Sequence, residues 1–294
     1  MSFAVVTVIH DSAADLERLL ASVERFLEPP RPAVVVVDSG SRDAGAGVAR
    51  DHGAEVLELP GNQGFGAGCN AGLARVTEPV TVLLNPDVEL LDRGLLDLVH
   101  RAEGADALLA PRLLDAGGRP QDSAHPRPGT VEALLPALLP RPILPRRLRQ
   151  RYEPWRSGAV RTVGWAIAAA LVARTDVLRR LGPFDPDAFL FYEDLDLGLR
   201  ASDAGVPTVL VPQVALRHRG GGSTRPALGG ETLELRAKRR REVMARRGRR
   251  ALVLDDTAQA LTFGTRAAVR GLLRRGGGRE CAQLRALATA RRAP

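Results

Sequence analysis

Cysteine and long apolar runs are scarce in this sequence of 294 residues, and both shortages exclude classes of protein. Cys69 and Cys281 are too few for a disulfide framework and lack the spacing of a cysteine metal site. No uncharged apolar stretch reaches the roughly 18 residues of a transmembrane helix, so none is expected. The opening MSFAVVTVIHD has no basic segment before its apolar run, unlike a secretory signal. These absences favour a cytosolic globular protein.

Positive charge is concentrated at the C-terminal end. The net charge is +8, but residues 225–294 hold 18 basic and 6 acidic side chains, whereas residues 1–224 hold 24 basic and 28 acidic ones. A basic tail of this kind favours an anionic partner, either a membrane surface or nucleic acid. A solvated, arginine-rich helical face explains the composition equally well.

Short apolar strands alternate with helices in the first part of the chain. Strands are predicted at 4–9, 34–38, 55–59, 80–84 and 105–110, and later at 166–173 and 208–211. Ser12 is placed to cap the first of the intervening helices. This alternation is typical of a Rossmann-like α/β fold, with a mostly parallel sheet flanked by helices.

Two segments depart from the alternation. Residues 115–161 begin with the turn signal DAGG and are rich in proline, so we interpret them as a surface excursion with a short amphipathic helix near 131–139. Residues 225–294 contain three helical stretches rich in Arg, Ala and Leu. We therefore expect an α/β domain over 1–224 and a basic helical extension over 225–294.

Carboxylates and glycine-rich turns follow the predicted strands, and the carboxyl ends of strands are where open α/β sheets bind ligands. Asp38, followed by the small Ser39, is placed to accept hydrogen bonds from a nucleobase or a ribose. The segment GNQGFGAGCNAG contains Asn62, Gly66 and Asn70. Its glycines allow the backbone to approach a ligand, and the helix that follows can face an anionic group.

A divalent metal site is indicated by LLNPDV and by a later histidine. Asn85 and Asp87 follow the strand 80–84, and cations bound through substrate phosphates usually take one or two protein carboxylates. His218 follows another apolar strand, and a neutral imidazole is a suitable second ligand. Arg219 and the glycine loop that reaches Ser223 are placed to contact a diphosphate.

The segment FYEDLDLGLR supplies a candidate base. Glu193 and Asp194 begin a predicted helix, where carboxylates also gain simple stabilisation from the helix dipole. The apolar residues around them can raise the pKa of a carboxylate that acts as a general base. Taken together, these motifs indicate a nucleotide-sugar site with a divalent metal, and therefore a glycosyltransferase.

With these motifs in this order, residues 3–224 resemble an inverting glycosyltransferase of family 2, and more closely its bacterial rhamnosyltransferase-like branch. The resemblance implies a GT-A fold, a nucleotide-diphosphate sugar donor, with dTDP-rhamnose preferred, and a cell-envelope or polyprenyl-linked glycan acceptor. The enzyme is expected in the cytoplasm, and a lipid-linked acceptor would give the basic tail a peripheral position at the inner face of the plasma membrane. No nucleic-acid partner is expected.

The resemblance further implies roles for individual residues. Asp194 matches the base of the Glu193–Asp194 pair, and Asp87 and His218 match ligands of Mg²⁺ or Mn²⁺. Gly164 and Trp165 fall on the acceptor side. The nucleotide-sugar residues implied are Ile9, Asp11, Asp38, Ser39, Asn62, Gly66, Asn70, Asn85, Asp87, Arg219 and Ser223.

Several positions depart from the family pattern. Ile9-His10-Asp11 replaces the usual Thr-Tyr-Asn, which leaves the nucleobase open, and Asp38-Ser39-Gly40-Ser41 replaces Asp-Asn-x-Ser. Asn85 stands at the first position of the metal motif in place of Asp, which predicts a modest metal affinity. Trp165 stands where a small residue is more common and predicts a narrower acceptor pocket.

Other functions are compatible with parts of the sequence. One alternative is a glycosyltransferase that uses a UDP- or GDP-sugar and acts on a soluble natural product. With such an acceptor, the basic tail would have a structural role only. A sugar-phosphate nucleotidyltransferase would need an arginine-containing glycine turn after the first strand, where this chain has His10-Asp11-Ser12-Ala13. An inactive domain with a nucleic-acid-binding tail is the third alternative, although the tail lacks interleaved aromatic residues.

Overall fold

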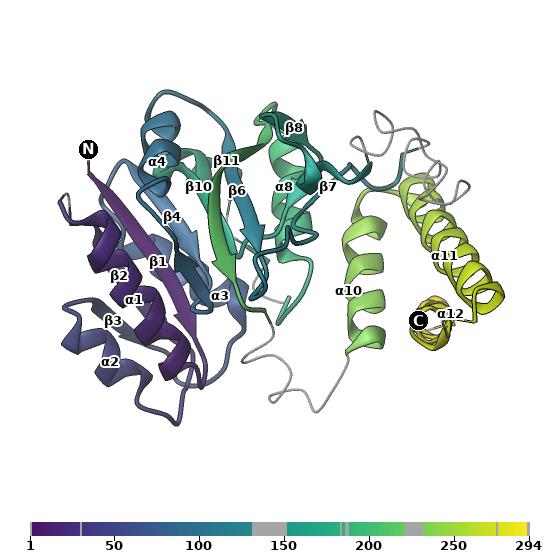
Figure 1. The fold of residues 1–294 in the computed structure, drawn as a ribbon, viewed down its shortest axis with the longest axis horizontal. Helices are drawn as coiled ribbons and strands as arrows, with labels where there is room; N and C mark the ends of the chain where they lie inside the picture. The colour runs from purple at the N-terminus through teal and green to yellow at the C-terminus, as the bar shows by residue number, and fades with distance from the viewer. Residues whose placement is uncertain are drawn as a thin grey trace. The chain divides into compact units, whose positions relative to one another are not determined.

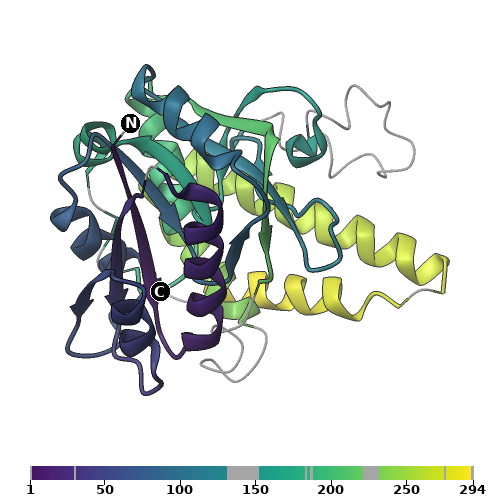
Figure 2. The ribbon, with the colours of Figure 1, turned by 60° about the vertical axis from the view of Figure 1, so that its left-hand side comes forward.

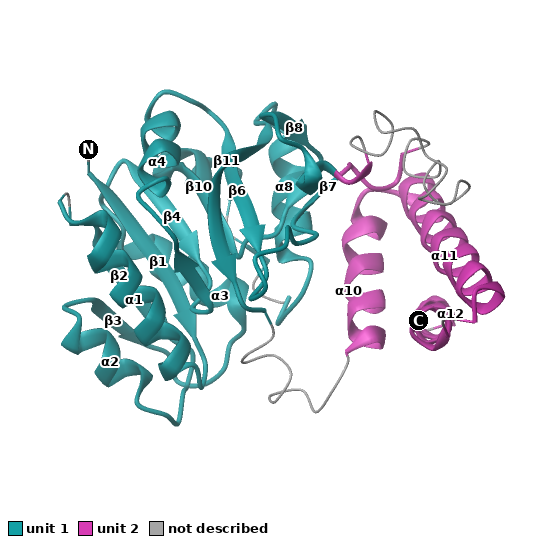
Figure 3. Ribbon diagram, in the orientation of Figure 1, with its two compact units in different colours: residues 1–125, 154–229 teal, residues 126–153, 230–294 magenta. Residues whose placement is uncertain are grey.

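The computed structural model describes residues 2–29, 31–130, 152–182, 184–185, 188–220, 232–274 and 276–292. The chain divides into two compact units, one of residues 1–125 and 154–229 and the other of residues 126–153 and 230–294 (Figure 3). The helix predicted near 131–139 lies outside the described residues. Among the helices that are described, none combines the length and apolarity needed to cross a membrane.

The first unit is built on a nine-stranded sheet with the order β3-β2-β1-β4-β10-β6-β11-β5, and β8 pairs with β11 (Figure 1). The strands are β1 Phe3–Ile9, β2 Ala33–Asp38, β3 Glu55–Glu58, β4 Val80–Leu84, β5 Val88–Leu90, β6 Leu108–Leu114, β8 Arg161–Val163, β10 Ala170–Arg174 and β11 Thr208–His218. A two-stranded sheet pairs β7, Ala124–His125, with β9, Trp165–Ala166.

The sheet is mostly parallel, which confirms the predicted fold class. Strands β1, β2, β3, β4, β6 and β11 run in one direction, whereas β5, β8 and β10 run in the other. Strand β11 is longer than predicted and continues to His218 through a register shift between Val211 and Ala215. Pro212 lies in this shift, where a residue without an N–H group is tolerated.

Helices cover both faces of the sheet (Figures 1 and 2). They are α1 Ala13–Leu27, α2 Gly45–Asp51, α3 Phe65–Arg75, α4 Leu95–Glu103, α7 Thr175–Leu181 and α8 Glu193–Asp203. Alternate side chains of β1 enter different cores: Phe3 and Val5 pack with residues of α1 and α4, and Ala4 and Val6 pack with residues of α3, α7 and α8. Burial on both faces explains the nearly continuous apolar sequence of these strands.

The cap of α1 differs from the prediction. Ser12 occupies the N-cap position, but its hydroxyl donates to the carbonyl of His10 at 2.8 Å. The carboxylate of Asp43 instead accepts a hydrogen bond from the N–H of Ala13 at 2.7 Å. The side chain of Asp43, 30 residues away in sequence, therefore accepts a free N–H at the start of α1, a role that was predicted for Ser12.

The second unit contains the helices α10 Leu233–Arg246, α11 Arg249–Leu272 and α12 Gly278–Arg292, which confirms the predicted helical extension. Three of its acidic residues, Asp255, Asp256 and Glu280, are buried. Asp255 is 2% exposed and accepts hydrogen bonds from Nε and Nη2 of Arg240 at 2.8 and 2.7 Å, and the buried Asp256 pairs with Arg241. A buried carboxylate needs a charged partner, so Arg240 and Arg241 pair with carboxylates inside the unit and are not available to an external anionic partner.

Candidate active site

The predicted site residues gather at the carboxyl edge of the sheet. Strands β1, β2, β4 and β11 are all parallel, so Ile9, Asp38, Asn85 and His218 stand at the same edge. Strand β10 runs the other way, so its beginning, at Ala170 beside Leu84, also lies there. This reversal brings the segment before β10 to the same edge as the ends of the parallel strands.

The proposed nucleobase side is formed by the loops after β1 and β2. The backbone N–H of Ser39 donates to the carbonyl of Ile9 at 2.9 Å, and the side chain of Ile9 lies in the core. Asp38 is 7% exposed, and its carboxylate accepts a hydrogen bond from the N–H of Ser41 at 2.8 Å. The backbone N–H of Arg42 bonds to Asp11 and lowers the pKa of that carboxyl, so Asp11 is an exposed anion at this edge.

The glycine-rich loop approaches its neighbours closely. Gly64 has a φ of +85°, and a Cβ atom there would lie 2.0 Å from the carbonyl oxygen of Phe189. Ser39 is buried and its hydroxyl accepts the N–H of Gln63 at 2.9 Å, while the exposed Asn62 accepts the N–H of Gly64 at 3.1 Å. These contacts tie the loop after β2 to the loop before α3.

Two further residues of this loop have packing partners. Gly66 is buried, and a Cβ atom there would lie 3.1 Å from Cβ of Phe184. The side-chain amide of Asn70 donates to the carbonyl of Phe184 and accepts its N–H, both at 2.8 Å. The side chain of Asn70 therefore anchors the segment that leads to α8, and its oxygen and nitrogen atoms both have hydrogen-bond partners there.

Asp87 and His218 form the candidate metal pair. The Nε2 atom of His218 lies 3.3 Å from Oδ1 of Asp87, and the two side chains are 13% and 11% exposed. Burial opposes the ionisation of Asp87, but hydrogen bonds from His218 and from the N–H of Gly220 outweigh it and hold the pKa of Asp87 below its ordinary value. The carboxylate is therefore charged at neutral pH.

This pair fits a divalent cation that is shared with a ligand. Two ligands at about 2.1 Å from an octahedral ion and at right angles are about 3 Å apart, close to the observed separation. Within the described part of the chain, no group of three or more His, Cys, Asp or Glu residues is arranged to hold a metal. The remaining positions would therefore fall to phosphate oxygens and water, as is usual for Mg²⁺. In the same described part, the buried side-chain oxygen of Asn85 has no hydrogen-bond partner.

Asp194 is linked to this pair by the turn before β10. Its Oδ2 atom accepts the N–H of Ala168 at 3.3 Å, and the carbonyl of the adjacent Ala169 accepts the N–H of Asn85 at 2.9 Å. One short backbone segment thus holds both the Asn85–Asp87 turn and the carboxylate of Asp194. The arrangement places a candidate base and a candidate metal pair at one edge.

The turn before α8 is strained. Phe191 and Tyr192 have φ values of +74° and +65°, which non-glycine residues rarely adopt. Glu193, which follows them, is buried. Strain of this kind persists where the surrounding structure enforces it, often at functional sites.

Aromatic packing supports the strained turn. The ring of Trp165 lies 6.3 Å from that of Tyr192 and stacks on His125 at 4.2 Å. Trp165 is 5% exposed, and Gly198 of α8 leaves room for it, since a Cβ atom at Gly198 would lie 2.6 Å from Cβ of Trp165. Gly164 donates its N–H to the carbonyl of His125 at 2.8 Å. Gly164 and Trp165 therefore form a packed wall behind the turn.

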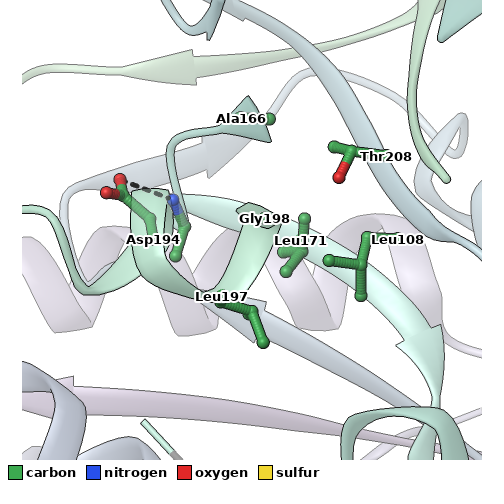
Figure 4. A pocket seen from close by; sticks show the side chains of 8 residues that line it. Leu108, Ala166, Leu171, Asp194, Leu197, Gly198 and Thr208 are labelled. Atoms are coloured by element: carbon green, nitrogen blue, oxygen red, sulfur yellow. Dashed lines mark hydrogen bonds between the residues drawn. The ribbon is translucent and has the colours of Figure 1, made fainter. Parts of the chain in front are cut away.

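A narrow crevice adjoins Asp194 on its inner side (Figure 4). It is lined by Leu108, Ala166, Ala168, Leu171, Asp194, Leu197, Gly198 and Thr208. The crevice is too tight to admit a water molecule, so it is a packing defect and not a sugar site.

Of the remaining predicted residues, Arg219 lies beside Glu89. Arg219 and Arg217 contact Oε2 of Glu89 at 3.3 and 3.0 Å. Burial raises the pKa of Glu89, but the hydrogen bonds and charges of the two arginines outweigh this effect and hold that pKa below its ordinary value. Arg219 is 43% exposed and remains reachable by a ligand. Ser223 lies outside the described residues.

Sequence reasoning did not find Gln121, whose side chain contacts His218. The turn signal at 115–118 was visible, and the structure shows that this turn folds the chain back onto β6, with the N–H of Gln121 bonded to the carbonyl of Leu113 at 2.8 Å. The neighbouring strand of β6 is β11, which ends at His218. That pairing has no local signal in the sequence.

Comparison with known sequences reveals a family match over most of the first unit. The model of the family described as "Glycosyl transferase family 2" matches residues 4–172. An N-acetylglucosaminyl-diphospho-decaprenol L-rhamnosyltransferase of Mycobacterium tuberculosis is 31% identical over 243 residues, which cover 75% of this chain and 76% of the relative. A pre-mycofactocin glycosyltransferase of the same organism is 30% identical over 73% of this chain and 42% of its own length.

Solved structures of glycosyltransferases share the fold. GalNAc-T7 with UDP, GalNAc and Mn²⁺ superposes with a TM-score of 0.62 at 16% identity, over 83% of this chain and 48% of that one. The mannosyltransferase PcManGT from Pyrobaculum calidifontis, in complex with GDP-Man and Mn²⁺, superposes with a TM-score of 0.57 at 16% identity. The match covers 98% of this chain and 73% of that one. At these identities the likeness concerns the GT-A-type fold.

Proposed function

The chain belongs to glycosyl transferase family 2, and from this premise we propose that it transfers L-rhamnose from dTDP-rhamnose to a polyprenyl-diphosphate-linked glycan. The name of the rhamnosyltransferase relative supports L-rhamnose as the transferred sugar and a diphospho-polyprenol-linked acceptor. One observation carries the proposal: Asp194 and the Asp87–His218 pair stand at the same sheet edge, joined through Ala168 and Ala169.

The proposed reaction is a single displacement with inversion at the anomeric carbon. Asp38 and the loops around it hold the nucleotide, and Asp87 and His218 are the residues that would hold Mg²⁺ or Mn²⁺. A bound cation would stabilise the charge of the departing diphosphate. Asp194 accepts the proton of the acceptor hydroxyl as its oxygen attacks the sugar, and nucleoside diphosphate leaves on the opposite side.

The donor proposal predicts selective stabilisation by nucleotides. We expect dTDP with Mn²⁺ to raise the melting temperature more than UDP, GDP or CDP, and each nucleotide to act weakly without the metal. A ligand that binds only the folded state at about 100 times its Kd adds about 2.7 kcal/mol. Differential scanning fluorimetry of the whole chain measures the effect. A larger rise in melting temperature with UDP or GDP would identify that nucleotide as the donor's carrier in place of dTDP. No rise with any nucleotide would contradict the proposed donor site.

We also propose that the second unit binds an anionic membrane surface at the inner face of the plasma membrane, where a polyprenyl-linked acceptor would be found. Among its described residues, 232–274 and 276–292, the acidic side chains with substantial exposure are Glu234 and Glu242, of which Glu242 pairs with Arg239, whereas Asp255, Asp256 and Glu280 are buried. The exposed basic residues are Arg236, Lys238, Arg246, Arg249, Arg250, Arg270, Arg274, Arg279, Arg285, Arg291 and Arg292.

The end of α11 favours a bilayer over nucleic acid. Leu272 and Leu273 are 85% and 57% exposed, and the exposed Arg270 and Arg274 flank them. Apolar side chains beside arginines are suited to the headgroup boundary of a membrane, whereas nucleic acid would offer the leucines no apolar environment.

This surface predicts lipid-dependent sedimentation. The protein is expected to bind vesicles of phosphatidylcholine and phosphatidylglycerol but not of phosphatidylcholine alone, and Leu272→Ser with Leu273→Ser should weaken binding by about tenfold or more. Val253→Ser is the matched control, because Val253 is 53% exposed on the same helix but lies away from its C-terminal end. Equal binding of both variants, or tighter binding to duplex DNA than to these vesicles, would contradict the proposal.

A further inference from the structure

Gln121 contacts His218 through both atoms of its side-chain amide. Its Nε2 atom lies 2.6 Å from the backbone carbonyl oxygen of His218, and its Oε1 atom lies 2.8 Å from the ring Nδ1. The contact bridges 97 residues of sequence. It lies on the opposite side of the ring from Asp87, which faces Nε2.

The hydrogen-bonding capacities of these groups determine the position of the imidazole proton. A backbone carbonyl only accepts hydrogen bonds, so the NH₂ group of Gln121 must face it. The amide oxygen of Gln121 therefore faces Nδ1, and because this oxygen also only accepts, Nδ1 must carry a proton. In the neutral ring, Nε2 then has a lone pair directed toward a carboxylate oxygen 3.3 Å away.

We propose that Gln121 is a positioning residue, which holds His218 in the Nδ1–H tautomer so that Nε2 and Asp87 together can receive a divalent cation. Two acceptor atoms that face each other repel unless a proton or a metal cation lies between them. The protonated ring donates from Nε2 to Asp87, whereas in the neutral ring the amide of Gln121 opposes a change of tautomer and leaves the position to a divalent cation. This inference rests on the proposed function, since it concerns the same metal pair. It adds a residue that no sequence motif indicated.

The backbone around Gln121 is well suited to this role. The turn after β6 is held by Asp115, whose carboxylate accepts the N–H groups of Gly117 and Arg119 at 2.8 and 2.9 Å. Gln121 itself bonds to Leu113, and the carbonyl of Gln121 accepts the N–H of Ser123 at 2.9 Å. These hydrogen bonds hold the backbone from which the Gln121 side chain reaches His218. In other proteins, too, a hydrogen-bond partner behind a metal-binding histidine orients its ring.

The test combines the tautomer with metal affinity. Long-range ¹⁵N NMR of the metal-free protein, recorded over a series of pH values, identifies the proton-bearing nitrogen of His218, with His218→Ala for assignment. Mn²⁺ affinity in the presence of dTDP is measured by electron paramagnetic resonance. We expect Nδ1–H in the unmodified chain, Nε2–H as the main form in Gln121→Met, and a 10- to 100-fold weaker Mn²⁺ affinity in that variant.

Two further variants separate the explanations. Gln121→Glu retains an acceptor for Nδ1–H and should keep the Nδ1–H tautomer, although its carboxylate cannot donate to the carbonyl of His218 and is repelled by it. Gln213→Met makes the same change at an exposed site on β11 and should alter neither readout. If Gln121→Met leaves the tautomer and the affinity unchanged, the inference is wrong. If the unmodified chain has the Nδ1–H tautomer but binds neither dTDP nor Mn²⁺, the proposed function fails and the tautomer assignment stands.

Discussion

Asp194→Asn is expected to lower the rate of sugar transfer by roughly 10²–10⁴-fold, the usual contribution of a general base. The amide can still accept the N–H of Ala168 through its oxygen, so the turn before β10 should remain in place. Nucleotide binding depends on other residues and should be unchanged. Steady-state transfer from dTDP-rhamnose, together with dTDP binding by calorimetry, measures both quantities.

The control for Asp194→Asn is Asp97→Asn, which neutralises an exposed carboxylate in the first turn of α4. It removes a similar favourable interaction with a helix dipole but lies away from the proposed site. We expect its activity to be that of the unmodified chain. Loss of dTDP binding along with transfer in Asp194→Asn would show that Asp194 supports the donor site and does not act as the base.

Asp87→Asn should abolish the effect of Mn²⁺ on nucleotide binding and lower transfer by about 10²–10³-fold, since charge stabilisation by a bound metal amounts to several kcal/mol. The side-chain oxygen of Asn can still accept the N–H of Gly220, so folding should be retained. The melting temperature with dTDP, with and without Mn²⁺, is the direct measurement.

Glu89→Gln provides the comparison for Asp87→Asn. Glu89 is also an acid of this edge with a lowered pKa, but its partners are Arg217 and Arg219 and not His218. The variant should keep its response to Mn²⁺. An unchanged response in Asp87→Asn would mean that the metal, if used, binds elsewhere.

Local patterns were sufficient for the first strands of the sheet and for the ends of β1, β2 and β4. Apolar runs of β-branched residues predicted β1, β2 and β4, and the polar residues directly after them, Asp38 and Asn85-Pro86-Asp87, are at the carboxyl edge as expected. The reason is physical: a strand buried on both faces must be apolar along its length, and the first polar residues mark where it reaches solvent.

The direction of β10 was not predictable from its own residues. A strand buried on both faces has the same apolar pattern whether it runs parallel or antiparallel to its neighbours. Only the packed sheet shows that β10 is reversed, which brings Ala168 and Ala169 between Asn85 and Asp194. The relation between the candidate base and the candidate metal pair therefore depends on tertiary structure.

Side-chain partners were the least predictable feature. Asn70 belongs to the glycine-rich motif, yet its amide binds the backbone of Phe184, and Asp43 caps a helix that Ser12 was expected to cap. The sequence by itself determined β1, β2 and β4, their ends and the chemical groups placed there, because these follow from short-range periodicity. The tertiary structure alone decided which of those groups face one another, as Gln121 and His218 do, because contacts between distant segments depend on the order and direction of strands in the sheet.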